Sequence, residues 1–414
     1  MKAGCIAPFL AAVAASVAPG QRKLALTGGE GSPLSGVLSG TGALSSLDGV
    51  VGSIGGAVFR AAGAFTRMGR MMMGYDDQED SSPTAHDVYH ITVPQSDETE
   101  NEDAVVDIIR ESGQTHFTGL LDAYGKLSEL LADEGKEFTV FVPTDEAFRR
   151  LQGFEKSEGA LMGEILEYHV LEGRIGVDEL RRMRTAETVL ESGSRQQRFR
   201  ISDEGGGLEL GFYSRVLASE SRRGRNGVVH FVDEVLVPPP RHDVLLEAFA
   251  GDRLRSFSKA VSRAGTAAES GRVVTVFAPS DAAWTALGDE VEEFLFSEEG
   301  KVWLRALVGY HVVVGAAVYS DTLDVAERRG FRTGLEGAEV SVEARGPGSM
   351  AVNGVEVSVG DVIARDGVVH VVEKMLLPPA PGDEGGKEQV SVEGIKRRLA
   401  RFVHLAEVHG TEEL

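Results

Sequence analysis

Three sequence blocks occur twice along this chain, in the same order, with the second copy of each about 140 residues after the first. The blocks are Phe-Val-Pro-Thr-Asp-Glu-Ala-Phe at 141–148 and Phe-Ala-Pro-Ser-Asp-Ala-Ala-Trp at 277–284, Tyr-His-Val at 168–170 and 310–312, and Gly-Val-Val-His at 227–230 and 367–370. A unit of this length is far longer than a solenoid repeat of roughly 20–50 residues. We therefore expect each copy to be a complete domain with its own hydrophobic core.

Each copy shows the same local pattern around its first block. Apolar residues at helical spacing precede it, most clearly at 117–131 in the first copy. Runs rich in β-branched and aromatic residues at 138–142 and 273–277 then reach a proline, which cannot donate to a strand ladder. The hydroxyl and carboxylate residues that follow can cap the N-terminus of the next helix. The pattern predicts a strand–turn–helix junction in each domain, and it assigns capping rather than catalysis to Thr144, Asp145, Ser280 and Asp281.

At these blocks the sequence resembles the fasciclin family of adhesion domains. The resemblance covers residues 103–240 and 243–380, and it implies two α+β domains, each a wedge-like β-sandwich with a group of helices on one side. It also implies an adhesion or extracellular-matrix role through surface binding to a protein receptor or matrix component, with no catalytic activity and no cofactor. Trp284 departs from the family pattern by replacing the usual Phe, and the first copy carries extra residues at 220–225.

The resemblance further implies candidate binding residues. In animal relatives the Tyr-His region and an Asp-Ile-containing segment before the last block are associated with integrin binding. The matching positions here are Tyr168, His169, Tyr310, His311, Asp361 and Ile363. Against this, tyrosine and histidine can pack their apolar bodies inward and satisfy their polar tips by hydrogen bonds. The apolar neighbours favour that packing interpretation, and we expect the same of His230 and His370 in their valine-rich strands.

A basic cluster stands out in this acidic chain, and it consists of Arg222, Arg223 and Arg225. Guanidinium groups bind sulfate and carboxylate through paired hydrogen bonds. The cluster therefore suggests an alternative function, that of a cell-wall protein that binds acidic polysaccharide. The other interpretation is a solvated surface loop, because most runs of charge face water.

Charge and cysteine content exclude several kinds of site. The chain has 42 Lys plus Arg against 64 Asp plus Glu and a net charge of −22, which argues against a nucleic-acid binder. Cys5 is the single cysteine, so no internal disulfide and no thiolate metal site can form. His86 and His90 have a spacing that suits a metal on a helix, but they lie in a segment without regular periodicity, so we expect no preformed metal site.

The two ends of the chain carry different signals. Residues 1–18 have the short basic start, apolar run and small residues of a secretory signal peptide, which predicts a secreted protein. Residues 19–102 are rich in Gly, Ser and Ala and predict a disordered low-complexity leader. This leader also resembles a transit segment, so a plastid reached through the secretory route is the alternative location. Its apolar part is too short for a span of about 20 residues, so we expect no integral membrane span. Residues 381–414 predict a linker and an amphipathic helix that packs on the second domain.

Overall fold

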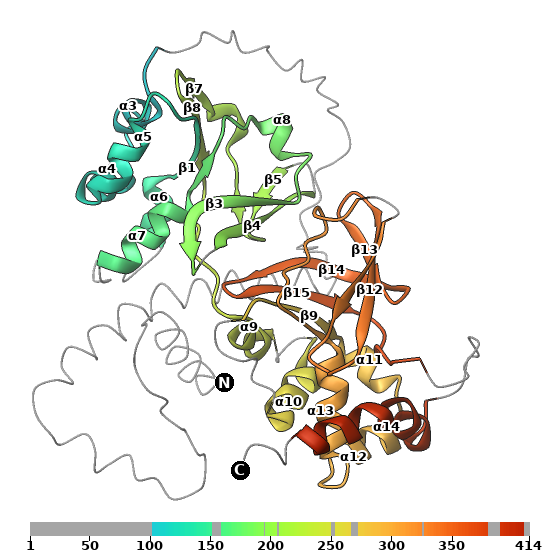
Figure 1. Ribbon diagram of the computed structural model, residues 1–414. Helices are drawn as coiled ribbons and strands as arrows, with labels where there is room; N and C mark the ends of the chain where they lie inside the picture. Colours follow the sequence, from blue (N-terminus) through green and yellow to red (C-terminus); the bar gives the residue numbers. More distant parts are fainter. Residues whose placement is uncertain are drawn as a thin grey trace, which may run out of the picture.

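The computed structural model describes residues 102–150, 159–193, 195–204, 207–249, 253–265, 272–324, 327–379 and 390–409. Within these ranges the chain forms two domains that lie against each other, each with helices gathered on one side of its strands (Figure 1). The predicted pair of α+β domains is confirmed. The signal peptide, nearly all of the leader, and the histidines at 86 and 90 lie outside the described residues.

The helices of the first domain bury their apolar faces against its central strands. They are α3 (Val105–Glu111), α4 (Thr115–Ala123), α5 (Gly125–Leu131), α6 (Asp145–Arg150), α7 (Gly159–Tyr168) and the short α8 (Val177–Leu180). The predicted helical stretch at 117–131 is divided into α4 and α5, because Tyr124 leaves the helical conformation at φ −102° and ψ 66°. The patterns we used do not predict α3, which lies ahead of the first block.

The strands of the first domain form two four-stranded sheets. The strands are β1 (Phe138–Pro143), β2 (Val170–Glu172), β3 (Thr185–Ser192), β4 (Arg195–Glu204), β5 (Gly207–Leu210), β6 (Ser214–Arg215), β7 (Arg222–Gly224) and β8 (Gly227–Val232). One sheet has the order β2-β1-β8-β7 and the other the order β3-β4-β5-β6. β1 and β8 are fully buried and run parallel along six residue pairs, so the first and last sequence blocks meet at the centre of the domain.

The second domain repeats this plan with a different connection between its sheets. Its helices are α9 (His242–Phe249), α10 (Arg255–Ala264), α11 (Asp281–Thr285), α12 (Asp289–Phe296), α13 (Lys301–Tyr310) and α14 (Val392–His409). Its strands are β9 (Val274–Pro279), β10 (Val312–Val314), β11 (Arg328–Arg332), β12 (Glu339–Gly346), β13 (Ser349–Val352), β14 (Val355–Ala364) and β15 (Gly367–Val372). All seven join one sheet of order β10-β9-β15-β14-β13-β12-β11, because β14 is long enough to pair with strands on both sides of a bend.

The hydroxyl and the carboxylate of the first block serve different helices. The Thr144 and Ser280 hydroxyls accept the backbone N–H three residues further on, at 3.2 and 3.3 Å, and so cap α6 and α11 as predicted. The carboxylates of Asp145 and Asp281 instead reach α4 and α10, where each accepts the N–H of the second helical residue, at 3.0 and 2.8 Å. The prediction that these carboxylates cap the following helix is wrong in this respect, because the preceding helix packs closer to them.

The amphipathic C-terminal segment forms α14 and packs on the second domain. Ile395, Leu399, Phe402 and Val403 are buried in the same apolar cluster as the domain's central strands. The Lys396 ammonium adds two contacts to the same domain, because it lies 3.1 Å from the Glu299 carboxylate and 4.6 Å from the centroid of the Phe294 ring. The first domain has no counterpart of this helix among its described residues.

Candidate functional site

The central histidines tie the end of each domain to the helix that directly precedes them, α7 in the first domain and α13 in the second. His169 and His311 are buried, and their Nδ1 atoms lie 2.7 and 2.8 Å from backbone carbonyls four residues earlier, in α7 and α13. The Nε2 atoms accept the backbone N–H of Leu236 and Leu376, at 2.9 and 3.1 Å. Since Nε2 accepts, the proton resides on Nδ1 and both rings are neutral. Burial lowers the pKa of each histidine to about 4, against the opposing effect of the carbonyl hydrogen bond.

The neighbouring tyrosines are also turned inward. Tyr168 donates its hydroxyl to the backbone carbonyl of Arg198 at 2.7 Å, and Tyr310 donates to that of Glu339 at 3.3 Å. Both rings are buried, and burial raises the pKa of both hydroxyls. These contacts account for the polar tips and support the packing interpretation. Tyr168 and Tyr310 are 4% and 2% exposed and both histidines at most 1%, so the Tyr-His pairs offer little surface to a receptor.

The strand histidines of the last block occupy a second buried position in each domain. The Nε2 atoms of His230 and His370 lie 2.9 and 2.8 Å from the carbonyls of Ile175 and Val318. The Nδ1 of His230 meets the Ser221 hydroxyl at 2.8 Å, whereas the Nδ1 of His370 accepts the backbone N–H of Asp361 at 3.2 Å. Burial lowers the pKa of both rings. Neither histidine is placed for acid–base chemistry at the surface.

The Asp-Ile segment of the second domain is buried rather than displayed. Asp361 is 3% exposed and has a left-handed φ of 57°. Its carboxylate accepts the backbone N–H of Ser320 at 2.9 Å and also the Ser320 hydroxyl. Ile363 is 8% exposed and packs with Tyr319 and Val368. Asp361 therefore holds the turn at residues 319–321 from within.

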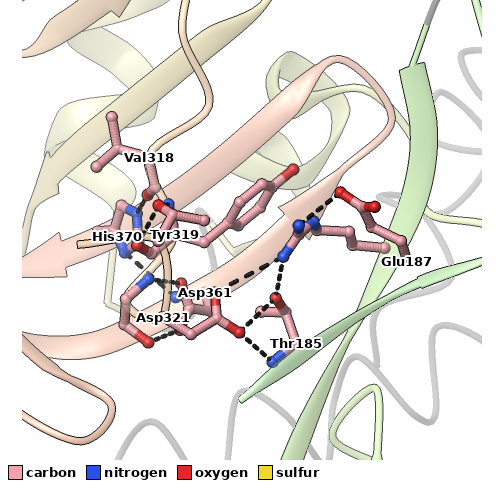
Figure 2. A network of polar contacts seen from close by, with 10 residues as sticks. Thr185, Glu187, Val318, Tyr319, Asp321, Asp361 and His370 are labelled. Atoms are coloured by element: carbon pink, nitrogen blue, oxygen red, sulfur yellow. Dashed lines mark hydrogen bonds and ion pairs between the residues drawn. The ribbon is translucent and has the colours of Figure 1, made fainter. Parts of the chain in front are cut away.

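That turn is one of the places where the domains meet (Figure 2). The Asp321 carboxylate accepts the backbone N–H and the hydroxyl of Thr185 in β3, at 2.9 and 2.8 Å. The guanidinium of Arg198 in β4 lies over the Tyr319 ring, 4.6 Å from its centroid, and 3.6 Å from Asp321. Arg198 also donates to Glu187 of its own domain. A half-buried aromatic and ionic contact thus joins β3 and β4 of the first domain to the second.

The turn between β14 and β15 makes another contact between the domains. Arg365 forms a two-pronged ion pair with Glu164 of α7, at 2.9 and 3.1 Å. Its backbone carbonyl accepts the side-chain amide of Gln197 at 2.9 Å, and its N–H donates to Pro240 in the connecting segment at 2.9 Å. Asp366 accepts the N–H of His242 at 2.9 Å. The connecting segment is therefore fastened to the second domain on both sides of Arg241.

The sequence patterns missed the residues of both contacts. None of Thr185, Arg198, Asp321 and Arg365 belongs to a repeated block or to a recognisable motif. A signal was nevertheless available in the repeat itself. Asp361, whose carboxylate supports one contact, stands where the first copy has Ser221, since the strand histidine follows each of them by nine residues.

The three arginines of the basic cluster lie on and just after β7, at the edge of a sheet. Arg222, Arg223 and Arg225 are exposed. Arg222 lies over the Phe231 ring, 5.3 Å from its centroid, and Arg225 lies 2.9 Å from the Glu134 carboxylate. The backbone N–H of Arg225 donates to the carbonyl of Asp103 at 2.9 Å. The cluster therefore belongs to an edge strand and the turn after it, and not to a free loop.

Within the described ranges, no group of three or more His, Cys, Asp or Glu residues could hold a metal ion. No described helix combines the length and apolar character needed to cross a membrane. Two surface pockets, of about 240 and 430 Å³, lie on the second domain near Asn353 and Leu377. Of the binding candidates from the sequence, Tyr310 lines the larger pocket and none lines the smaller one.

Comparison with known proteins gives a consistent result. The family model of the fasciclin domain matches residues 112–238 and 252–378. The chain is 26% identical over 318 residues to aurofusarin biosynthesis cluster protein S of Gibberella zeae, covering 66% of this chain and 77% of that protein. It is 27% identical over 293 residues to the fasciclin-like arabinogalactan protein elcF of Phaeosphaeria nodorum, covering 67% and 87%.

Two further similarities involve animal proteins. The chain is 24% identical over 320 residues to human periostin, which covers 75% of this chain but only 35% of periostin. Among solved structures, it is similar to a FAS1 domain pair from the insect cell adhesion molecule fasciclin I, with 21% identity and a TM-score of 0.33 over 64% of this chain and 98% of that one.

Proposed function

The chain belongs to the fasciclin domain family, and from that premise we propose that it is an exported adhesion or extracellular-matrix protein that acts by surface contact. Its partner is a protein receptor or a matrix component. The observation that carries the proposal is the burial of the signature side chains in both domains, because it leaves recognition to the outer surfaces. The two contacts around Asp321 and Arg365 present those surfaces as one unit.

The described side chains support a binding role over a catalytic one. The histidines of the repeated blocks are buried and their pKa values are lowered, so they are neutral near pH 7. The hydroxyls and carboxylates of the first block cap helices. Burial would raise the pKa of Asp145, but hydrogen bonds from His116 and Thr115 lower it to about 2, which suits a structural anion and not a proton donor.

An adhesion assay tests surface contact against the Tyr-His hypothesis. Beads coated with the full chain are placed under flow on matrix deposited by cells of the source organism, with albumin-coated beads as the control. We expect retention of the coated beads, and equal retention for the double variant Tyr168→Phe and Tyr310→Phe, which removes only buried hydroxyls. No retention would contradict the adhesion function. Loss in a double variant that is still folded by circular dichroism would instead support the Tyr-His region as the binding site.

Two alternatives remain proposals with their own support. Exposed Arg223 and Arg225 of the basic cluster support an acidic-polysaccharide-binding cell-wall protein. The composition of residues 19–102 supports a plastid destination through the secretory route. A fluorescent fusion of residues 1–75 separates the two locations: fluorescence in the medium or wall supports export, and fluorescence in plastids contradicts the extracellular function.

A further inference from the structure

The internal repeat makes it possible to find, in the first domain, the counterpart of the surface by which the second domain contacts its neighbour. The alignment rests on hydrogen bonds that occur in both domains. The Nε2 of His230 lies against the carbonyl of Ile175, and the Nε2 of His370 lies against that of Val318. Ile175 and Val318 are therefore equivalent, and the residue after each begins an equivalent turn.

In the second domain this surface is apolar at its centre. Ala317, Tyr319, Ile363 and Val368 form a small cluster of their own, separate from the main core. Tyr319 lies beneath the Arg198 guanidinium of the first domain, and Arg365 at the rim pairs with Glu164. We call this surface the docking face of the second domain, because it is the surface that the first domain covers.

In the first domain the equivalent surface is basic. Two of the four apolar or aromatic positions become arginine, since Arg174 replaces Ala317 and Arg223 replaces Ile363. Gly176 takes the position of Tyr319, and Arg225 takes that of Arg365. A Cβ atom on Gly176 would lie 3.8 Å from the Arg223 guanidinium, so this group occupies the space that the Tyr319 ring fills in the second domain. Arg174 donates to the backbone carbonyl of Arg225, which brings the three arginines together.

Arg222 does not belong to this surface, although it is next to Arg223 in the sequence. Successive side chains of a strand point to opposite faces of the sheet. Arg222 lies over Phe231, and it is paired across the strands with Val229 on the same face; Arg223 is paired with Val228, which shares the opposite face with His230. We call the surface of Arg174, Arg223 and Arg225 the basic face. It lies near β7, at the end of the first domain remote from the second (Figure 1).

We propose that the basic face binds a linear acidic polysaccharide through the guanidinium groups of Arg174, Arg223 and Arg225. The proposal rests on the surface-binding function above and names its ligand class. Guanidinium groups bind carboxylate and sulfate in a two-pronged geometry that suits a ligand with repeated anionic groups. The acidic partners of Arg174 and Arg225 within the chain are Glu137 and Glu134, whose side chains are 58% and 72% exposed. The Arg225–Glu134 pair is exposed on both sides, at 47% and 72%, so it contributes little and a ligand can replace it. Arg174 is 27% exposed and its Nε atom is buried, so a ligand would reach only the outer part of its guanidinium group.

Other occupants fit this surface less well. Folded protein partners usually bind through buried aromatic or aliphatic anchors, and the basic face has lost the Tyr and Ile of its counterpart. A second copy of this chain fits less well. The surface that it would bring lies around β11, the equivalent of β3, where the carboxylates of Glu343 and Glu327 already pair with Arg328 and Arg329.

Binding of the full chain to fluorescent heparin and to fluorescent polygalacturonate tests the proposal, with dextran as the neutral control and poly-L-glutamate as the acidic peptide control. We expect binding to at least one of the two anionic polysaccharides, weakened by added salt, because salt screens exposed charges. The heparin and polygalacturonate arms separate sulfate from carboxylate recognition. We expect Arg174→Ala with Arg223→Ala to weaken this binding about tenfold or more.

Matched variants separate a defined face from diffuse charge. Arg222→Ala removes the same charge from the same strand as Arg223→Ala, and Arg328→Ala with Arg329→Ala matches the double variant on the other domain. We expect these controls to change the affinity less than about twofold. Thermal unfolding confirms that each variant is folded.

Three results would overturn the proposal: no binding to either polysaccharide, equal losses for Arg222→Ala and Arg223→Ala, or tighter binding of poly-L-glutamate than of both polysaccharides. The last result would indicate an acidic protein partner. Bead adhesion measured in parallel keeps the two proposals apart, because beads that are retained without polysaccharide binding contradict only the ligand class.

Discussion

The two domains of this chain share their interiors and differ at their outer faces. His169 and His311 make the same two backbone hydrogen bonds at nearly the same distances. In contrast, Ser221 of the first domain occupies the position of Asp361 in the second, and Arg223 occupies the position of Ile363. Positions that agree between the copies stabilise each core, whereas positions that differ determine what each domain can contact. The repeated blocks are therefore informative about the fold, and the differences between copies are informative about binding.

One local difference in a strand changes how the strands of each domain are joined into sheets. In the second domain β14 runs unbroken for ten residues and joins all seven strands into one sheet. In the first domain the corresponding stretch is interrupted by a 3-10 turn, Ala218–Glu220, which leaves β6 and β7 as separate short strands. Residues 220–225 are not an insertion relative to the second copy, contrary to the expectation from the sequence, because Ser221 and Asp361 both stand nine residues before the strand histidine. The interruption places the arginines on an edge strand, while the continuous strand carries Asp361 beneath the contact between the domains.

The largest expected effect comes from the glycine that begins the last strand of each domain. A Cβ on Gly227 would lie 1.9 Å from the carbonyl oxygen of Phe138, and one on Gly367 would lie 1.8 Å from that of Val274. These are backbone atoms at the centre of the sheet, so they cannot move aside. We expect Gly227→Ala and Gly367→Ala each to lower the free energy of unfolding of its own domain by at least about 3 kcal/mol.

Denaturant unfolding of the full chain, followed separately by labels in each domain, measures this effect. Gly354→Ala is a control for a glycine with no atom nearby, although its φ of 77° adds some strain. A loss shared equally by both domains would contradict the independence of the two cores.

The next effect concerns pH and should be the same in both domains. The pKa of His169 and of His311 is about 4 in the folded chain, against an ordinary value of 6.5. Between these values the unfolded chain binds more protons, so stability falls as the pH falls from 6.5 towards 4. We expect a loss of roughly 2 kcal/mol per histidine between pH 6.5 and pH 5.

Urea unfolding at a series of pH values measures this loss, and His169→Gln or His311→Gln should flatten the dependence in one domain only. Buried His230 and His370 add to the background with the same sign, because their pKa values are also lowered. Stability that is constant from pH 6.5 to pH 5 would show that the rings are accessible to protons in the folded chain.

The smallest effect should distinguish the domains most clearly. Asp361→Asn keeps a side chain that tolerates the left-handed backbone and retains an acceptor for Ser320, but it removes the charge. We expect a loss of about 1 kcal/mol in the second domain, together with a wider distribution of distances between spin labels on the two domains. Ser221→Ala, at the equivalent position, should leave that distribution unchanged, since Ser221 supports no contact between the domains. An unchanged distribution in Asp361→Asn would show that the 319–321 turn holds its shape without the carboxylate.

Much of the fold could be predicted from local patterns. Periodicity and proline placement located β1 and β9, and the hydroxyls of Thr144 and Ser280 cap the helices as expected. These features depend on residues close together in the chain. The packing of the Tyr-His pairs could also be anticipated, because both stand among apolar residues. The helical stretch of 117–131 was read as continuous, since no spacing rule marks the change of direction at Tyr124.

The contact between the domains could not be predicted in this way. Thr185 and Asp321 are 136 residues apart, and Glu164 and Arg365 are 201 apart. Such pairs depend on how two complete folds are oriented, and charged surface residues are abundant in any sequence of this composition. The reach of Asp145 and Asp281 to the preceding helix was missed for a related reason, because it requires knowing which helix packs beside each turn.

The short connection at Pro240 and Arg241 determines how the pair carries tension. A pull on the first domain passes along β8 into this connection, which is fastened to the second domain through Arg365 and Asp366. β8 itself is held along its length by six parallel pairings with β1, so the load acts in shear on many hydrogen bonds at once instead of opening them one by one. The joint between the domains should therefore yield before either core, which would let the protein lengthen under strain while both domains stay folded.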